Sequence, residues 1–396
     1  MADAVRGAEA QVPRPGGAPP QREFVLREAL EELVRRNGSD LHLKVGRPPM
    51  VRVQGELHET ALPPLRPEDL KRCAEQTMNP RQREEFGEKK EIDFAIGVSG
   101  LGRFRSNIYQ QRGTLGMTFR AIPVEVPALT SLELPPVLQE IAMVPRGLVL
   151  VTGVTGSGKS TTLAAMLKHL NERRAVNIVT VEDPIEFLHR DQKAIVSQRE
   201  VGADTHSFHD ALRHVLRQDP DVIMLGEIRD RPSMETVLKA ADTGHMVMST
   251  LHTTDAAQTI GRIISFFPPH QHQEIRGVLA NALRAIVSLR LIPRADGPGR
   301  VPAAEILVNT STIAQMIRSA DDSLSINDMI ADGRVQYGMQ TFDQSLLELY
   351  RRGAITYEWA MHYATNPSEF QLRVSGVESG EQETWGGAPA ESRMDR

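Results

Sequence analysis

Residues 153–160 read Gly153-Val154-Thr155-Gly156-Ser157-Gly158-Lys159-Ser160, and this stretch decides the fold class of the chain. It matches the pattern G-x-x-x-x-G-K-[ST], which is typical of loops that bind nucleotide phosphates. The apolar segment 148–151 comes directly before it, and a helix-compatible run from Thr161 to Arg174 follows. Motif and context therefore both predict a P-loop rather than a glycine-rich turn.

The positions of this loop have different expected roles. Glycines permit backbone conformations that direct N–H groups at phosphate oxygens, and the start of the following helix adds positive potential. Lys159 is expected to neutralise the β- and γ-phosphates of ATP, and Ser160 to bind Mg²⁺. The predicted nucleotide-binding residues are Gly153, Thr155, Gly156, Ser157, Gly158, Lys159, Ser160 and Thr161.

The pattern around the loop predicts an α/β fold. Apolar strand cores separated by helical segments indicate a mostly parallel sheet between helices. The expected strands are 148–151, 177–181, 222–225 and 246–250. Later segments read as mainly helical: 278–292, 312–319, 324–332, 340–352 and 356–364.

The N-terminal part has a different pattern, typical of an α+β domain. Apolar residues from Phe24 to Leu33 recur at helical spacing, and Asn37-Gly38 ends the helix. Short alternating segments then predict strands, with one further helix. The strands are expected at 41–45, 51–53, 92–98, 103–109 and 114–121, and the helix at 67–77.

The length of 396 residues favours more than one domain, because single hydrophobic cores stop growing at about 250–300 residues. The proline-spaced segment after residue 122 is a natural linker. The predicted order is a disordered tail at 1–22, an α+β domain at 23–122, a linker at 123–128, a P-loop core at 129–310, a helical region at 311–375 and a second disordered tail at 376–396.

Composition excludes several classes. No apolar run approaches the roughly 20 residues of a membrane span, and the N-terminus lacks the pattern of a secretory signal. Cys73 is the single cysteine, which excludes an internal disulfide and favours the cytoplasm. A net charge of −5 gives no overall electrostatic reason to bind nucleic acid, so none is expected as a partner.

Two groups of carboxylates follow predicted strands. Glu227 comes after strand 222–225, at the sheet edge where ligands bind, and can orient or deprotonate the water that attacks the γ-phosphate. The alternative is an edge acid paired with Arg229. Gly226 cannot supply the usual aspartate to a magnesium ion, so Glu182 or Asp183 is expected to contribute to metal or water binding. The alternative for these two is a solvated turn.

Histidines at both ends of the segment 244–254 are further candidates. His245 or His252 could sense a γ-phosphate through a hydrogen bond, although the residues alone favour ordinary core or surface histidines. His206, His209 and His214 have spacing that suggests a metal site, but adjacent acids are lacking and a polar helix face is the better interpretation.

Four motifs in order resemble those of the type II/IV secretion ATPases. They are the loop at 153–160, the segment Val181-Glu182-Asp183-Pro184-Ile185-Glu186, the segment Leu225-Gly226-Glu227-Ile228-Arg229-Asp230 and the segment 243–252. Within that superfamily the chain is similar to the type IV pilus retraction ATPases over about residues 23–375. The resemblance implies a PAS-like N-terminal domain and a RecA-like core. It also implies functional roles for Glu182, His245 and His252, and a catalytic role for Glu227.

The resemblance also implies an assembly. The family forms hexamers in which arginines of the N-terminal domain close on the phosphates, and guanidinium suits the charge that develops on a transferred phosphoryl group. Here these would be Arg103, Arg105, Arg112 and Arg120; the alternative is that they make a strand face soluble. A homohexamer, an inner-membrane pilus platform protein and a paralogous retraction ATPase are the partners implied.

The subfamily is suggested by two features. One cysteine cannot form the four-cysteine zinc motif usual in extension and secretion ATPases, and residues 338–346 resemble the C-terminal helices of the retraction group. One segment departs from that group: its A-I-R-N-L-I-R-E stands here as 312–319, Thr-Ile-Ala-Gln-Met-Ile-Arg-Ser. An accessory paralogue that assists another motor is therefore a second interpretation, and a nucleic-acid translocase on the same core is a third.

Overall fold

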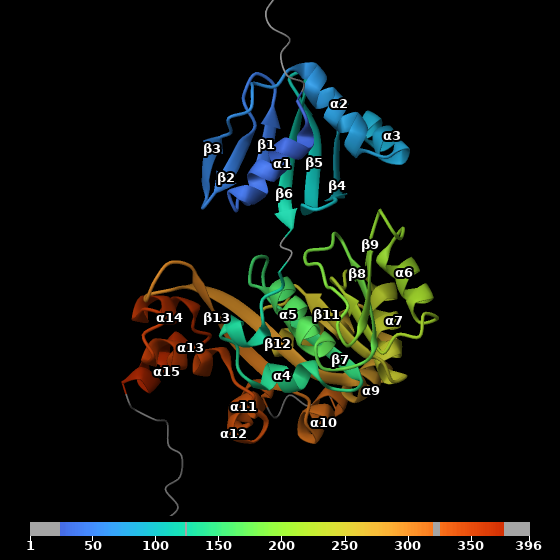
Figure 1. The fold of residues 1–396 in the computed structure, drawn as a ribbon. Helices are drawn as coiled ribbons and strands as arrows, with labels where there is room; N and C mark the ends of the chain where they lie inside the picture. Colours follow the sequence, from blue (N-terminus) through green and yellow to red (C-terminus); the bar gives the residue numbers. More distant parts are fainter. Residues whose placement is uncertain (1–23, 123–124, 320–324, 376–396) are drawn as a thin grey trace, which may run out of the picture. The chain divides into compact units, whose positions relative to one another are not determined.

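The computed structural model describes residues 24–122, 125–319 and 325–375, and divides the chain into two units, residues 1–122 and 123–396 (Figure 1). The predicted tails at 1–22 and 376–396 lie outside the described residues, as do the first two residues of the predicted linker. No helix in the described ranges combines the length and the apolar character needed to cross a bilayer.

The first unit is a six-stranded antiparallel sheet with three helices, in strand order β3-β2-β1-β6-β5-β4. Its elements are α1 (Leu26–Arg35), β1 (Asp40–Lys44), β2 (Met50–Val53), β3 (Glu56–Glu59), α2 (Pro67–Thr77), α3 (Pro80–Lys89), β4 (Glu91–Val98), β5 (Gly102–Gln111) and β6 (Thr114–Ile122). Strand β3 and helix α3 were not expected from the sequence; the other elements confirm the predicted α+β pattern.

Alternation along the strands gives this sheet one apolar and one polar face. Leu41, Phe104 and Phe119 are buried with Leu30 of α1 and Leu70 of α2 in a single core cluster. The residues between them on the strands point to the other face, because successive strand side chains alternate. That polar face carries three of the arginines described below, Arg103, Arg105 and Arg120.

The second unit is a seven-stranded sheet in the order β13-β12-β7-β11-β10-β8-β9, parallel throughout except for the β12–β13 pair. Its strands are β7 (Gly147–Thr152), β8 (Asn177–Glu182), β9 (Ile195–Glu200), β10 (Val222–Leu225), β11 (Met246–Leu251), β12 (Leu283–Pro293) and β13 (Arg300–Val308). Its helices are η1 (Leu129–Leu132), α4 (Val137–Ala142), α5 (Lys159–Asn171), α6 (Phe208–Val215), α7 (Arg231–Asp242), α8 (Ala256–Ser265), η2 (Pro269–Gln271), α9 (His272–Ala282), α10 (Ser311–Ser319), α11 (Ile326–Asp332), α12 (Arg334–Tyr337), α13 (Phe342–Arg351), α14 (Tyr357–Tyr363) and α15 (Pro367–Val374).

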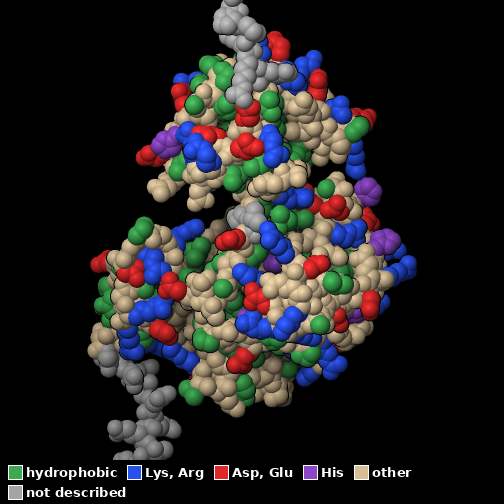
Figure 2. Space-filling view, in the orientation of Figure 1, with side chains coloured by type: hydrophobic (Ala, Val, Ile, Leu, Met, Phe, Trp, Pro, Cys, Tyr) green, Lys and Arg blue, Asp and Glu red, His purple; other side chains and the backbone are tan. Residues whose placement is uncertain are grey.

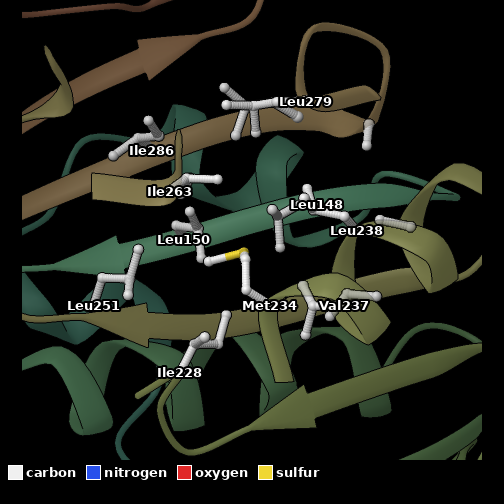
Figure 3. Packing of buried hydrophobic residues seen from close by; sticks show 14 of the residues in the cluster. Leu148, Leu150, Ile228, Met234, Val237, Leu238, Leu251, Ile263, Leu279 and Ile286 are labelled. Carbon is white, nitrogen blue, oxygen red and sulfur yellow. The ribbon is translucent and has the colours of Figure 1, made fainter. Parts of the chain in front are cut away.

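Helices cover both faces of this sheet, which confirms the predicted layered arrangement. Helices α4 and α5 pack on one face, where Val149 and Met248 contribute to the core. Helices α6 to α9 cover the other face, where Leu150 and Met234 lie among aliphatic side chains (Figure 3). Strand β7 is buried along its whole length, so the loop that follows it starts from the interior of the sheet.

The prediction of a helix over 278–292 is wrong for most of that range. Helix α9 ends at Ala282, and residues 283–293 form β12. Because β12 is buried on both faces, its apolar residues show no alternation, and such a run cannot be told from a buried helix by periodicity. The return strand β13 and the edge strand β9 were likewise not expected.

The C-terminal helices cover the β13 edge of the sheet. Phe342, Leu346 and Leu349 of α13 pack with Ile292 and Val301 in a separate core cluster. The guanidinium of Arg290 lies 3.7 Å from the centre of the Phe342 ring and donates to the carbonyl of Tyr363. The helical region is thereby joined directly to the two strands that the sequence did not predict.

Candidate functional site

The loop at 153–158 links β7 to α5 and has an unusual backbone. Gly153, Gly156 and Gly158 have φ values of 141°, 78° and 96°, a region that L side chains rarely adopt. A Cβ on Gly153 would also lie 2.6 Å from the carbonyl oxygen of Leu289. Helix α5 begins at Lys159, so the positive end of its dipole faces the loop. This geometry is a cradle for phosphate oxygens.

Lys159 lies within this cradle with its side chain buried. Its Nζ donates to the carbonyls of Gly153, at 2.8 Å, and of Val154, at 3.0 Å. Burial lowers the pKa of Lys159, and the nearby carboxylates of Glu227 and Glu186 oppose that shift. The two carbonyls hold the ammonium group where a bound phosphate could replace them as acceptors. Ser157, also buried, has a hydroxyl that makes no hydrogen bond within the described residues.

Glu227 lies two residues beyond β10 and is brought together with two basic side chains. Its Oε1 pairs with the guanidinium of Arg229, and its Oε2 lies 3.5 Å from Nε2 of His252. His252 is the first residue after β11, so two neighbouring parallel strands position the pair. The ion pair with Arg229 is the alternative weighed for Glu227 in the sequence. Glu227 also follows β10 at the sheet edge where the phosphate loop follows β7, because β7, β11 and β10 are parallel neighbours.

Glu182, the last residue of β8, is almost fully buried. Its Oε1 accepts hydrogen bonds from Thr180, at 2.7 Å, and from Gln198, at 3.1 Å. Burial raises the pKa of Glu182, and those two hydrogen bonds oppose the rise. Thr180 and Gln198 were missed in the sequence; only their alternation with Glu182 across two adjacent strands could have indicated them, and β9 was not predicted.

Gly226 links the end of β10 to the neighbouring strands β8 and β11. Its N–H donates to the carbonyl of Val181 at 2.8 Å, and a Cβ on it would lie 3.5 Å from the Cα of Glu182. The hydroxyl of Thr250 donates to the carbonyl of Gly226 at 2.7 Å. Three strands, β8, β10 and β11, therefore meet at one edge behind the phosphate loop.

Asp183 follows Glu182 and is exposed at that edge. Among the described residues no group of three or more His, Cys, Asp or Glu side chains is placed to hold a metal ion. In nucleotide sites Mg²⁺ commonly binds phosphate oxygens and water with only one or two protein ligands. Ser160, in the first turn of α5, and Asp183 are oxygen donors suited to such an ion.

His245 does not lie with the other candidates. It precedes β11, its Nδ1 is 3.1 Å from the carbonyl of Ala240, and its own carbonyl accepts from Gly147 at the start of β7. Strands rise about 3.3 Å per residue, so His245 is roughly 20 Å from the end of the sheet that carries the loop. His245 is therefore not brought to the phosphate loop of its own chain, and its role in sensing a γ-phosphate stays a prediction.

The four candidate arginines lie in the first unit, on or between β5 and β6. Arg105 and Arg120 are directly opposite each other on the polar face, and Arg120 donates to Asp40 at 2.8 Å. Burial raises the pKa of Asp40, but hydrogen bonds from Ser39 and Arg120 outweigh it and hold that pKa below its ordinary value. Arg103 stands two residues before Arg105 along β5.

Arg112 is separated from the other three. It occupies the turn between β5 and β6 with a φ of 44°, seven residues along the strand from Arg105. At about 3.3 Å per residue that separation is roughly 23 Å, so Arg112 cannot act on the same ligand group as the opposed pair in one first unit.

Comparison with known proteins places this geometry in a family. Residues 124–381 match the family described as type II/IV secretion system protein. Two relatives from Pseudomonas aeruginosa are a type IV pilus ATPase PilU, 42% identical over 88% of this chain and 91% of the relative, and a type IV pilus retraction ATPase PilT, 44% identical over 87% and 99%. A solved structure of the pilus retraction motor PilT with bound ADP is 43% identical, covers 88% of this chain and 99% of that one, and has a TM-score of 0.80. These matches confirm the predicted fold class and the resemblance stated for the sequence.

Proposed function

The chain belongs to the family of type II/IV secretion system proteins, and from that premise we propose that it is a motor ATPase that drives retraction of a type IV pilus. The observation that carries the proposal is that the 153–160 loop, Glu227 and His252 follow the carboxyl ends of three neighbouring parallel strands, with Glu227 and His252 3.5 Å apart. The names of its PilT and PilU relatives support the proposed role in pilus retraction.

In the proposed reaction, ATP binds with its phosphates in the loop. Lys159 leaves the carbonyls of Gly153 and Val154 for the β- and γ-phosphates, where its charge offsets the charge that develops during phosphoryl transfer. Glu227 orients a water molecule for attack on the γ-phosphorus and accepts its proton as the P–O bond to ADP breaks. His252 and Arg229 hold the carboxylate in place until then.

A magnesium ion would be held by Ser160 and by phosphate oxygens, with Asp183 and, through water, Glu182 completing its surroundings. When bound, it would neutralise charge on the phosphates. Glu182 is less suited to direct binding because Thr180 and Gln198 already donate to one of its carboxylate oxygens.

The working form is proposed to be a homohexamer at the cytoplasmic face of the inner membrane. ATP binding would draw the two units of the chain together, with arginines such as Arg105 and Arg120 adding positive charge near the phosphates. Hydrolysis and product release would reopen them. The output would be rotation of an inner-membrane platform protein, so that pilin subunits leave the base of the fibre.

Steady-state ATP hydrolysis by the full chain tests the site. We expect Mg²⁺-dependent turnover in the wild type and a loss of at least about a hundredfold in Lys159→Ala and in Glu227→Gln. Lys159→Ala should also weaken binding of a fluorescent ADP analogue, whereas Glu227→Gln should retain it. Glu369→Gln, at a half-buried acid of α15 that pairs with Arg373, is the matched control. Turnover at the wild-type rate in both site variants would refute the assignment.

A second candidate function is that of an accessory ATPase that assists another retraction motor. The observation that favours it is helix α10, where the retraction group's segment A-I-R-N-L-I-R-E is only partly retained. Arg318 remains and donates to Asn281 at the end of α9, but Ala314 and Ser319 occupy positions where the group has an arginine and a glutamate. Weak turnover alone, raised by addition of a PilT-type motor, would favour this candidate.

A nucleic-acid translocase is the least supported alternative. On the face seen in Figure 2, acidic and basic side chains are interspersed over the second unit rather than gathered by sign, and the net charge is −5. Binding to a phosphate backbone depends on a concentrated basic surface. Stimulation of hydrolysis by DNA or RNA would favour this alternative over pilus retraction.

A further inference from the structure

A buried acid in β13 has no place in the reaction described above. Glu305 is 5% exposed and stands between apolar neighbours on the β13 edge of the sheet. Burying a carboxylate is costly unless it is hydrogen-bonded or paired. Its partners therefore indicate what it does.

The principal partner is the start of helix α8. Oε1 of Glu305 accepts the backbone N–H of Ala256, the first residue of that helix, at 2.8 Å. The first four N–H groups of a helix have no partner within the helix, and a negative charge at this end is favourable. Asp255 caps a different donor, the N–H of Gln258. Glu305 thus supplies, from 49 residues away, an acceptor that the helix itself lacks.

Several charged groups face Glu305 from the elements packed against it. They are Arg290 of β12, Asp255 before α8 and Asp343 of α13. Burial raises the pKa of Glu305 to about 7; the hydrogen bond from Ala256 and the charge of Arg290 oppose the rise, while Asp255 and Asp343 add to it. The charge of this carboxylate therefore changes within the physiological range.

Helix α8 begins directly after the segment that carries His252. Residues 252–255 join the end of β11 to α8, and the hydroxyl of Thr253 contacts that of Thr259 at 2.7 Å, inside the first turns of the helix. The position of His252 against Glu227 thus depends on where the first turn of α8 is fixed. Glu305 is the anchor of that turn on the sheet side.

Glu305 is also linked to the strand that precedes the phosphate loop, through a row of buried polar side chains. Glu305 lies opposite Ser288 on β12, and the hydroxyl of Thr152 donates to that of Ser288 at 2.8 Å in the buried interior. Thr152 is the residue before Gly153. A row of buried polar side chains therefore runs from the residue preceding the phosphate loop to the anchor of α8.

We propose that Glu305 is a positioning residue: by holding the N-terminal turn of α8 to β13, it keeps the segment 252–255 in the place that sets His252 beside Glu227. This inference rests on the proposed ATPase function for its effect on turnover. It assigns Glu305 no contact with nucleotide, so substitution should change kcat more than nucleotide affinity.

Glu305→Ala and Glu305→Gln in the full chain test the proposal by steady-state ATPase kinetics. Removing the acceptor should lower kcat at least about tenfold with KM changed less than twofold, since small displacements of catalytic groups have effects of this size or larger. The amide oxygen of glutamine keeps an acceptor, so Glu305→Gln should retain more of kcat than Glu305→Ala. Asp69→Ala is the matched control, because Asp69 is a buried carboxylate that accepts the N–H of Arg66 at the start of α2 in the first unit. It should reduce stability and leave kcat unchanged.

The pH profile supplies a readout that a merely structural role would not change. At pH 6 the wild-type carboxyl is mostly neutral and resembles glutamine, so the kcat values of Glu305→Gln and wild type should agree. At pH 8 the ionised wild-type group is the stronger acceptor, so the ratio of variant to wild-type kcat should fall to about one third. A ratio that stays constant from pH 6 to 8 would overturn the proposal, even where Glu305→Ala fails to fold. So would wild-type kcat in a folded Glu305→Ala.

Hydrogen exchange separates this inference from the proposed function. The peptide covering residues 252–262 should exchange at least about tenfold faster in Glu305→Ala than in wild type, and no faster in Asp69→Ala. If the wild type hydrolyses no ATP, the proposed function fails while this measurement still decides whether Glu305 anchors α8. An unchanged exchange rate in this peptide would contradict the proposal that Glu305 anchors α8.

Discussion

At the scale of single residues, the phosphate loop depends on its glycines for two different reasons. Gly153 needs both its positive φ and the absence of a side chain, because a Cβ would meet Ser157 and the backbone of Leu289. Gly156 also has a positive φ, but nothing lies within 4 Å of where its Cβ would stand. Glycine is therefore required at position 153 by both packing and backbone conformation, and at position 156 by backbone conformation alone.

Alanine substitutions should separate these two cases. Gly153→Ala should abolish binding of a fluorescent ADP analogue, because the backbone of Leu289 belongs to a buried strand and cannot move aside. Gly156→Ala has only the conformational cost, about 1–2 kcal/mol, and should weaken binding by roughly fivefold to thirtyfold. Equal affinities for the two variants would contradict the distinction.

Much of the site could be predicted from residue types and their order, because the motifs carry their own chemistry. Lys159, Glu227 and His252 are found where the sequence places them, at the carboxyl edge of parallel strands. The position of His245 could not be predicted in the same way. Its motif spans the whole of strand β11, so His245 and His252 lie at opposite ends of the sheet. Only the bounds of β11 distinguish the end that faces nucleotide from the end that does not.

At the scale of elements, the β12–β13 pair joins the nucleotide edge to the C-terminal helices. Arg290 on β12 is half-buried against Phe342 of α13, and Glu305 on β13 accepts a hydrogen bond from the start of α8. This pair is also where prediction from sequence failed, since the doubly buried β12 reads as a helix and β13 was not recognised. An isolated acid within the apolar run 303–307 was the available signal for a special position.

Glu305 should make stability depend on pH in a direction that follows from its pKa. The folded value, about 7, lies above the ordinary 4.5, so between these values the folded state binds more protons and stability falls as pH rises. The full loss, reached above pH 7, is about 3 kcal/mol. Glu305→Gln should therefore unfold at a higher temperature than wild type at pH 8, with the difference vanishing towards pH 4.5. A difference that is constant with pH would contradict this account.

Helix α13 offers a second test at this scale. Thr341 caps it by accepting the N–H of Gln344, whose side chain accepts the N–H of Thr341 in return. Thr341→Ala should cost about 1 kcal/mol, or roughly 2–4 °C in the unfolding temperature of a unit this size. Thr341→Ser keeps the hydroxyl and should stay within 1 °C of wild type in the same calorimetric scan.

At the scale of the whole molecule, the two units carry complementary groups. The second unit holds the phosphate loop and the carboxylates, whereas the first presents Arg105 and Arg120 on an exposed sheet face. The sequence could predict the two patterns because the periodicity changes from short alternating strands to buried ones near residue 123. It could not tell which arginines share a face, since that depends on the register of β5 and β6.

The proposed ring has a direct physical check. Light scattering of the full chain with ATP and Mg²⁺ should give about six times the chain mass of 43.9 kDa. Arg105→Ala with Arg120→Ala should leave that mass unchanged and lower kcat at least about tenfold, because the charge they add acts during phosphoryl transfer. Arg81→Ala, on helix α3 of the same unit, is the control. A monomer under all nucleotide conditions would rule out the ring.

The central claim is that ATP hydrolysis at this site retracts a pilus, and the most direct measurement follows labelled pili in cells that lack the gene. Cells complemented with the wild-type gene should retract their pili. Cells without it, or with Glu227→Gln in its place, should accumulate surface pili that do not retract. Retraction at wild-type frequency and force in the Glu227→Gln cells would contradict the account, and retraction with reduced force would assign the chain to the accessory role instead.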